Sequence, residues 1–318
     1  MINNDVLRVI NANGAGDGAL RKFYYYMENN SGCTLHEICE DQHLMNSLGV
    51  GPQVARNIYN EKESAARLQE ELACNNIDMC WLGDDEFPKG IRALKSGNIP
   101  AVLFYKGNFE LVDKKCVGFT GSRKVSDLGI RITEESAKQL SKEGATVVSG
   151  YAKGVDMTAH RTALQEGGNT IFVLVEGLLK NKVKGEVKEL LNDKNHLFVS
   201  QFIPNLTWSA SNAMKRNNTI VGLSDAMILI ESGMEGGTFN AGQQSLKNGK
   251  KLFVVDYMTP KPTAEGNSYF ISMGGIPVRG DRMGNPVLNK VCLTLEQESA
   301  KRTYERYRQY AQMTLELL

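Results

Sequence analysis

Residues 117–123 read VGFTGSR, and residues 149–156, about one helix further along the chain, read SGYAKGVD. Each stretch is an apolar run that stops in a short glycine-containing loop just before a helical pattern. Loops of this kind lie side by side at the carboxyl edge of a parallel sheet. Their free backbone N–H groups, together with the helix N-termini behind them, form a site for an anion. The two stretches therefore predict a phosphate site, for either a nucleotide or a nucleic-acid backbone.

The alternation of apolar runs and helical patterns continues along the chain. Strands that are apolar throughout and alternate with amphipathic helices are typical of a parallel sheet covered on both faces. The pattern predicts an α/β fold, an extended Rossmann-like, doubly wound parallel sheet. The predicted strands are 77–82, 101–105, 116–119, 145–148, 170–175, 197–200, 226–230, 251–255 and 277–279, and the helical stretches between the core strands lie near 128–142, 156–166, 183–192, 214–223 and 239–248.

The pattern of helix-like and strand-like runs divides the chain into three parts. We expect a helical N-terminal module over residues 1–75, the Rossmann-like domain over 76–289 and a helical tail over 290–318. Residues 48–58 read LGVGPQVARNI, the pattern of a helix-hairpin-helix turn in a small SAM-like module, with two glycines around an apolar residue and a proline that opens the next helix. Such a turn offers backbone N–H groups to a DNA phosphate, and it is equally typical of a plain tight turn.

Bulk properties limit the classes of function. The net charge is +1 over 318 residues, so any affinity for nucleic acid must come from a local basic groove. Six cysteines without a C-x-x-C pair predict reduced thiols and no metal site. The N-terminus is not a signal peptide and no apolar run has membrane-spanning length, which predicts a cytoplasmic protein with no membrane partner. No motif indicates a cofactor.

Several ordered motifs resemble the DprA family, also called Smf, of bacterial DNA-processing proteins. The resemblance covers roughly residues 75–256, and more loosely the N-terminal module. It rests on Phe87-Pro88 with the stretch 99–107, on Gly121-Ser122-Arg123, on residues 149–156 with Ala159-His160, on Arg216-Asn217 with Ile220, Gly222, Leu223 and Ser224, and on Glu231 with Gly236-Gly237-Thr238.

The resemblance implies that the chain binds single-stranded DNA on its Rossmann-type domain. It implies no bond-breaking step, hence no catalytic residue and no enzyme. It further implies a homodimer that loads a RecA-type recombinase in natural transformation (competence) or DNA recombination. A role in phage defence is a further possibility that the sequence leaves open.

The chain departs from the family pattern at several positions. Glu176 stands where a glycine is expected, Asn218 replaces an arginine, and Asp256-Tyr257 replaces a proline-glycine pair. A lysine-rich run at 180–184 replaces a tyrosine-proline pair, and the C-terminal winged helix of many relatives is not visible. These departures leave the fold prediction intact, and they bear on the identity of the bound anion and on the recombinase partnership.

The predicted binding residues lie in the loops that follow the strands. Arg123 is expected to hold a phosphate through two parallel N–H bonds, and Lys153 to add a point charge. Lys215 and Arg216 are expected to form a basic pair just before a helix that starts near Asn217. The full set of predicted DNA- or phosphate-binding residues is Gly121, Ser122, Arg123, Ser149, Gly150, Lys153, Lys215, Arg216, Asn217, Gly236, Gly237 and Thr238, with the last three completing the anion pocket.

Other residues extend this interpretation. A basic track of Lys180, Lys182 and Lys184 suits the backbone of a single strand. Trp208, in a polar loop, is favoured over Tyr151 and Phe202 as the ring that stacks on bases.

Asp156 and His160, four residues apart, lie on one face of a helix. A helix cap plus a hydrogen bond that sets the loop is favoured for this pair over an acid/base pair for N-glycosidic hydrolysis.

A second class of function is a nucleotide-binding sensor or a phosphoribohydrolase-like enzyme on the same fold. The sequence disfavours the hydrolase, because Ala241 and Gly242 lie where its general base is expected. The sensor needs only the pocket, so it stays open.

Overall fold

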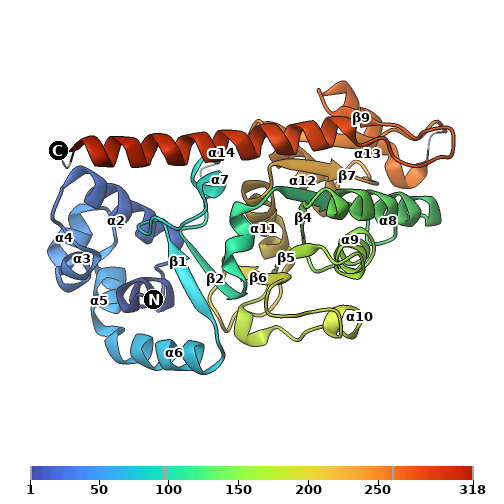
Figure 1. Cartoon of the computed structure of the whole chain (residues 1–318). Coiled ribbons are helices and arrows are strands. Elements are labelled where there is room, and N and C mark those ends of the chain that lie inside the picture. Colours follow the sequence, from blue (N-terminus) through green and yellow to red (C-terminus); the bar gives the residue numbers. More distant parts are fainter. Residues whose placement is uncertain (1, 96–98, 260, 317–318) are drawn as a thin grey trace.

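A computed structural model describes residues 2–95, 99–259 and 261–316. Within these residues the chain forms a nine-stranded sheet with helices packed around it (Figure 1). The strands are β1 (Asp78–Trp81), β2 (Val102–Gly107), β3 (Cys116–Thr120), β4 (Thr146–Ser149), β5 (Asn169–Val173), β6 (His196–Ser200), β7 (Ala226–Leu229), β8 (Lys251–Val255) and β9 (Ile276–Val278).

The strand order reverses at β3. It runs β1-β2-β6-β5-β4-β3-β7-β8-β9, with parallel pairing from β6 to β9 and antiparallel pairing of β1 and β2 at one edge. The chain moves outward from β3 through β4 and β5 to β6, returns to the other side of β3 with β7, and then moves outward again. This is the doubly wound arrangement, so the predicted α/β fold is confirmed. Ligands of such sheets bind beyond the carboxyl ends of the strands.

The helices follow the strands as predicted, with two exceptions. The stretch 183–192 forms only a four-residue helix, because the side chains of Asn192 and Asn195 bond to nearby backbone groups and compete with the helix. The helix predicted to start near Asn217 starts at Ala210 instead, where the Ser209 hydroxyl caps it. The helices of this part are α7 (Lys89–Arg92), α8 (Asp127–Lys142), α9 (Val155–Gln165), α10 (Gly185–Lys188), α11 (Ala210–Leu223), α12 (Gly236–Lys247), α13 (Glu265–Ser272) and α14 (Asn289–Glu316), with 3₁₀ turns η1 (Phe109–Asp113), η2 (Leu178–Lys180) and η3 (Pro262–Ala264).

Each face of the sheet has its own helix layer. Val117 and Phe119 of β3 pack in one apolar cluster with α8, α9 and the first turns of α14. Val148 of β4 and Leu229 of β7 belong to a second cluster that includes residues of α11 and α13. Because neighbouring side chains of a strand point to opposite faces, apolar strands of this kind must be covered on both sides.

Residues 4–74 form the helices α1 (Asn4–Asn11), α2 (Asp17–Asn29), α3 (Leu35–Glu40), α4 (Gln42–Ser47), α5 (Pro52–Asn60) and α6 (Lys62–Cys74). Their apolar side chains belong to the same core cluster as β1 and β2. Tyr24 of α2 packs edge-on against Trp81 of β1, with ring centres 6.5 Å apart, and accepts a hydrogen bond from Arg92 at 3.1 Å. These contacts fasten the N-terminal helices to the antiparallel edge of the sheet.

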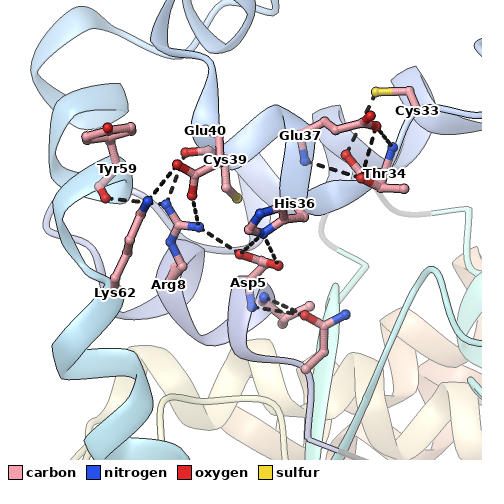
Figure 2. Close-up of polar contacts among 12 residues, drawn as sticks. Asp5, Arg8, Cys33, Thr34, His36, Glu37, Cys39, Glu40, Tyr59 and Lys62 are labelled. Atoms are coloured by element: carbon pink, nitrogen blue, oxygen red, sulfur yellow. Dashed lines mark hydrogen bonds and ion pairs between the residues drawn. The ribbon is translucent and has the colours of Figure 1, made fainter.

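Arg8 ties the N-terminal helices to one another (Figure 2). Its side chain is buried, and Nη1 pairs with Asp5 at 2.8 Å and with Glu40 at 2.9 Å. Nη2 donates to the carbonyls of Cys39 at 3.1 Å and Tyr59 at 3.3 Å. A buried charge is tolerated only when it is paired and hydrogen-bonded, so this network fixes α1 against α3 and α5.

The turn between α4 and α5 has the predicted hairpin form. Gly49 has a φ of +77°, which favours glycine, and Pro52 is the first residue of α5. Lys22 donates to the Gly49 carbonyl at 2.5 Å. A DNA phosphate at this turn stays a prediction.

The helix α14 packs on the sheet and continues past it, toward the side of the molecule where the N-terminal helices lie (Figure 1). Arg302 anchors it, because its guanidinium pairs with Asp225 and donates to the Lys114 carbonyl at 2.8 Å. Among the described residues, no helix combines the length and the apolar character needed to cross a bilayer.

Candidate nucleic-acid interface

A pocket of about 670 Å³ opens at the carboxyl edge of the sheet. The loops that follow β3, β4, β5 and β6 contribute its walls, together with α11. A volume of this order accommodates a ligand of nucleotide size. The lining residues are Arg123, Lys124, Tyr151, Ala152, Lys153, Val175, Glu176, Lys180, Lys184, Thr207, Trp208 and Arg216.

The two glycine loops that predict the site lie against each other. Gly154 has a φ of +82°, and a Cβ there would collide with the Ser122 carbonyl oxygen and lie 3.0 Å from Cα of Arg123. Glycine allows this backbone conformation and this close approach. The prediction that these loops lie side by side is confirmed.

Two backbone N–H groups of the loop after β3 are engaged within the protein. The Ser122 N–H donates to the Glu231 carbonyl at 2.9 Å, and the Lys124 N–H donates to the Ser122 hydroxyl at 3.0 Å. Gly121 serves packing, since a Cβ there would collide with Val155. The Ser122 N–H is therefore not free for an anion, and a binding role of Ser122 stays a prediction.

Arg216 is the buried cation of the pocket. It lies inside α11 rather than before it, is 6% exposed, and donates from Nη1 to the Val173 carbonyl at 2.7 Å. Its buried Nε has no hydrogen-bond partner among the residues that the structure describes. Burial lowers the pKa of Arg216, and Asp156 opposes that shift. A desolvated guanidinium that lines a pocket favours an anionic ligand.

Gly150 makes room for the Arg216 guanidinium. A Cβ at this position would collide with Nη1 of Arg216 and with Oδ2 of Asp156. Asp156 does not cap its helix, because Gly154 is the N-cap of α9 and Asp156 lies in the first turn. Burial raises the pKa of Asp156, and the charge of Arg216 opposes the rise. Gly150 thus acts by bringing a buried cation and a buried acid together under the pocket.

Ser149 and His160 are buried beneath the pocket and connect the strands. Ser149 Oγ donates to the Phe119 carbonyl at 2.7 Å. His160 Nε2 lies 2.6 Å from the Gly150 carbonyl and Nδ1 lies 2.5 Å from Thr170 Oγ1, which suits a neutral ring that donates from Nε2. Burial lowers the pKa of His160 to about 3. These contacts support the hydrogen-bonding interpretation of His160, and they give Ser149 a structural role.

The remaining cations surround the mouth of the pocket. Lys184 is half-buried, and its Nζ donates to the Tyr151 carbonyl and lies 4.1 Å from the centre of that ring. Burial lowers the pKa of Lys184. The exposed cations of the lining are Arg123, Lys124, Lys153 and Lys180. Six cations in all therefore face one pocket, whereas Lys182 lies outside its lining.

Trp208 is the accessible aromatic ring of the site. It is 53% exposed, and Cζ of Arg123 lies 6.0 Å from its ring centre. Tyr151 also lines the pocket, but its ring packs edge-on against the buried Phe172 at 5.1 Å. Phe202 is half-buried and does not line the pocket. An exposed indole beside a guanidinium suits a base stacked next to a phosphate.

Two predicted residues of α11 lie outside the pocket lining. Lys215 is exposed toward the N-terminal helices, where burial raises the pKa of Asp17 and the charge of Lys215 opposes that rise. Asn217 uses its amide to donate to the Gly237 carbonyl and to Asn240 Oδ1, both at 3.0 Å. Consecutive helix residues point about 100° apart, so Arg216 alone of the three enters the pocket.

The third glycine loop also lies outside the lining. Gly236 and Gly237 are exposed at the start of α12, and Thr238 is half-buried. This loop follows β7, which lies on the opposite side of β3 from β4 and β5. The role of this loop in anion binding stays a prediction, because β7 pairs directly with β3, whose own loop lines the pocket.

Lys124, Glu176 and Thr207 line the pocket without having been predicted as binding residues. Lys124 directly follows Arg123, and Glu176 directly follows the apolar run 170–175. Their positions just after strands could have indicated that they line the pocket. Thr207 carries no such signal. In the described part of the chain, no group of three or more His, Cys, Asp and Glu side chains is placed to hold a metal ion.

Comparison with known proteins places these features in one family. Residues 78–282 match the family described as DNA recombination-mediator protein A. DNA processing protein DprA of Streptococcus pneumoniae is 30% identical over 193 residues, which cover 60% of this chain and 67% of that protein. Protein Smf of Escherichia coli is 28% identical over 211 residues, which cover 63% of this chain and 56% of that protein. The match thus spans between about half and two thirds of these relatives' length.

Two solved structures share the fold. The X-ray structure of DprA from Streptococcus pneumoniae superposes with a TM-score of 0.74 at 26% identity, covering 87% of this chain and 95% of that one. A structure of DprA from Helicobacter pylori, described for its single-stranded DNA binding mode, gives a TM-score of 0.57 at 23% identity, covering 69% of this chain and 96% of that one. The likeness to the Helicobacter pylori structure, at 23% identity, shows a shared fold.

Proposed function

Because the chain belongs to the DNA recombination-mediator protein A family, we propose that it binds single-stranded DNA, with the phosphates held in the pocket around Arg216. The observation that carries this proposal is the largely buried Arg216 guanidinium, which lines one pocket together with five further cations. The proposal includes no bond-breaking step.

The charge arrangement favours a phosphate backbone. Burial of the Arg216 guanidinium is costly, and the nearby Arg123 charge repels it, so an anion between these cations is stabilising. The exposed cations at the mouth, such as Arg123 and Lys153, suit the successive phosphates of a strand. These cations contact phosphates rather than base edges. Because every nucleotide carries the same phosphate, these contacts give little sequence preference.

Trp208 supports a single strand over a duplex. An indole stacks on a base only when that base is unpaired and accessible. Its neighbour Arg123 would then contact the adjoining phosphate.

Fluorescence anisotropy of a labelled dT oligonucleotide, competed with duplex DNA and with free nucleotides, tests the proposal. We expect tight binding of the oligonucleotide at low salt and weak competition by duplex. Arg123→Ala should weaken binding, whereas Lys142→Ala, at the other end of α8, should not. No binding at low salt would refute the proposal.

A nucleotide sensor is a second candidate, supported by the pocket volume of about 670 Å³, which suits one nucleotide. Stabilisation of the protein by a free nucleotide in a thermal-shift panel, without binding of oligonucleotides, would favour it.

Loading of a RecA-type recombinase and assembly as a homodimer stay predictions from the family resemblance, as do roles in transformation and recombination; a role in phage defence stays open. Light scattering of the purified chain tests the dimer, and recombinase filament formation on protein-coated DNA tests the loading.

A further inference from the structure

Glu176 is an acid in a basic pocket. It lies three residues after the end of β5, is half-buried, and is the one acidic residue among the lining residues that the structure describes. The Ser200 hydroxyl donates to its backbone carbonyl at 2.8 Å and fixes the chain at this point. A carboxylate held beside phosphate-binding cations needs a physical explanation.

Lys184 and Arg216 attract the Glu176 charge but direct their donors elsewhere. Lys184 directs its Nζ to the Tyr151 carbonyl, and Arg216 directs Nη1 to the Val173 carbonyl. No hydrogen bond or ion pair of the Glu176 carboxylate is recorded within the described ranges 2–95, 99–259 and 261–316. The carboxylate therefore keeps its acceptor capacity for something that enters the pocket.

A phosphate is the wrong partner for Glu176, because two anions repel at short distance. The carboxylate can only accept hydrogen bonds, so its partner must present N–H or O–H groups. In a strand held by its phosphates, with one base against Trp208, the groups that remain are the Watson–Crick edges of the bases.

Among the four bases, guanine fits a carboxylate best. Its N1–H and N2–H₂ groups are adjacent parallel donors, which match the two carboxylate oxygens in a bidentate pair. Adenine and cytosine each offer one amino group beside an acceptor nitrogen, and thymine offers one N–H between two carbonyl oxygens. We propose that Glu176 makes this pocket read a guanine nucleotide. The inference rests on the proposed function, in that it assumes nucleotides enter the pocket.

The test compares dT oligonucleotides of equal length that carry one central substitution, by anisotropy at fixed salt. We expect a central dG to tighten binding by roughly tenfold over dT, and inosine, which lacks the N2 amino group, to lose most of that gain. Glu176→Gln should reduce the dG preference to below about twofold while it tightens binding of unsubstituted dT. Glu186→Gln, an exposed carboxylate on α10 outside the pocket lining, should leave the preference unchanged.

Two results would overturn the inference: equal binding of all the wild-type base series, or a dG preference that survives in Glu176→Gln. Both leave the proposed function standing, because the oligonucleotides still bind. Absence of any oligonucleotide binding would instead refute the proposed function. Competition by free dGMP and free dTMP identifies the source of the guanine. Glu176-dependent competition by dGMP supports a free guanine nucleotide as the ligand, and a dG preference without such competition supports a guanine within a strand.

Discussion

The guanidinium of Arg216 occupies the space that a side chain at Gly150 would need. A Cβ on Gly150 would collide with Nη1 of Arg216 and with the Asp156 carboxylate. These two residues are 66 positions apart in the chain and depend on each other. The absence of a side chain at Gly150 leaves the space in which the Arg216 guanidinium is buried.

Gly150→Ala tests this relationship. The added methyl group must displace Arg216 from the Val173 carbonyl, so we expect destabilisation of about 1–3 kcal/mol, as for overpacking of a core, together with weaker DNA binding. Urea unfolding and anisotropy measure the two effects. Gly18→Ala is the matched control, because nothing lies within 4 Å of its added Cβ. Equal stability and equal DNA affinity of the two variants would contradict the role of Gly150 in making room for Arg216.

Trp208 offers a direct optical signal. The chain has two tryptophans, of which Trp81 is 3% exposed and Trp208 is 53% exposed. We expect a dT oligonucleotide to quench the emission of the wild type and to leave that of Trp208→Phe unchanged. Trp208→Ala should weaken binding by about 1–3 kcal/mol through loss of stacking. Full quenching in Trp208→Phe would exclude the stacking role.

His160 makes folding stability depend on pH. Burial lowers its pKa from 6.5 to about 3. Below pH 6.5 the unfolded chain takes up a proton at His160 and the folded chain does not, so stability is fully present above pH 6.5 and falls as the pH falls toward 3. The expected loss between pH 6.5 and 5 is about 2 kcal/mol.

The measurement for His160 is urea unfolding at pH 7.5 and pH 5.0. His160→Gln removes the titrating group. Between pH 7.5 and pH 5.0 the unfolding free energy of this variant should therefore fall by about 2 kcal/mol less than that of the wild type. An identical pH dependence in both proteins would show that His160 titrates normally in the folded state.

Arg8 carries the stability of the N-terminal helices. Arg8→Met leaves the Asp5 and Glu40 carboxylates without this partner, and we expect a loss of about 3–5 kcal/mol, as for a broken buried ion pair. Arg67→Met, at an exposed pair 4.0 Å from Glu63, should change stability by less than about 0.5 kcal/mol. Denaturant unfolding checks both, and a loss at Arg8 below about 1 kcal/mol would contradict the role of the network.

The sequence was sufficient to predict the sheet, since each core strand is a run of apolar residues between loop residues, as in β3 and β8. It was less informative about helix starts. The α11 start was missed because Ser209 lies in a polar stretch that resembles a loop, and its capping bond is local geometry.

The site was predictable only in part. Arg123, Lys153 and Arg216 share the pocket because their loops and helix meet at one edge. The Gly236 loop carries the same kind of motif but lies outside the pocket lining, and how close two such loops come depends on long-range packing. The engagement of the Ser122 N–H by Glu231 depends equally on a contact between distant segments.

Salt dependence of single-stranded DNA binding tests the central claim most directly, with wild type compared against the triple variant Arg123→Ala, Lys153→Ala, Lys180→Ala. For roughly four neutralised phosphates, the logarithm of the binding constant should fall against the logarithm of salt with a slope of about −3, and the triple variant should be shallower by about 2. A wild-type slope near zero, or an unchanged slope in the triple variant, would contradict the binding of DNA phosphates by the cations of this pocket.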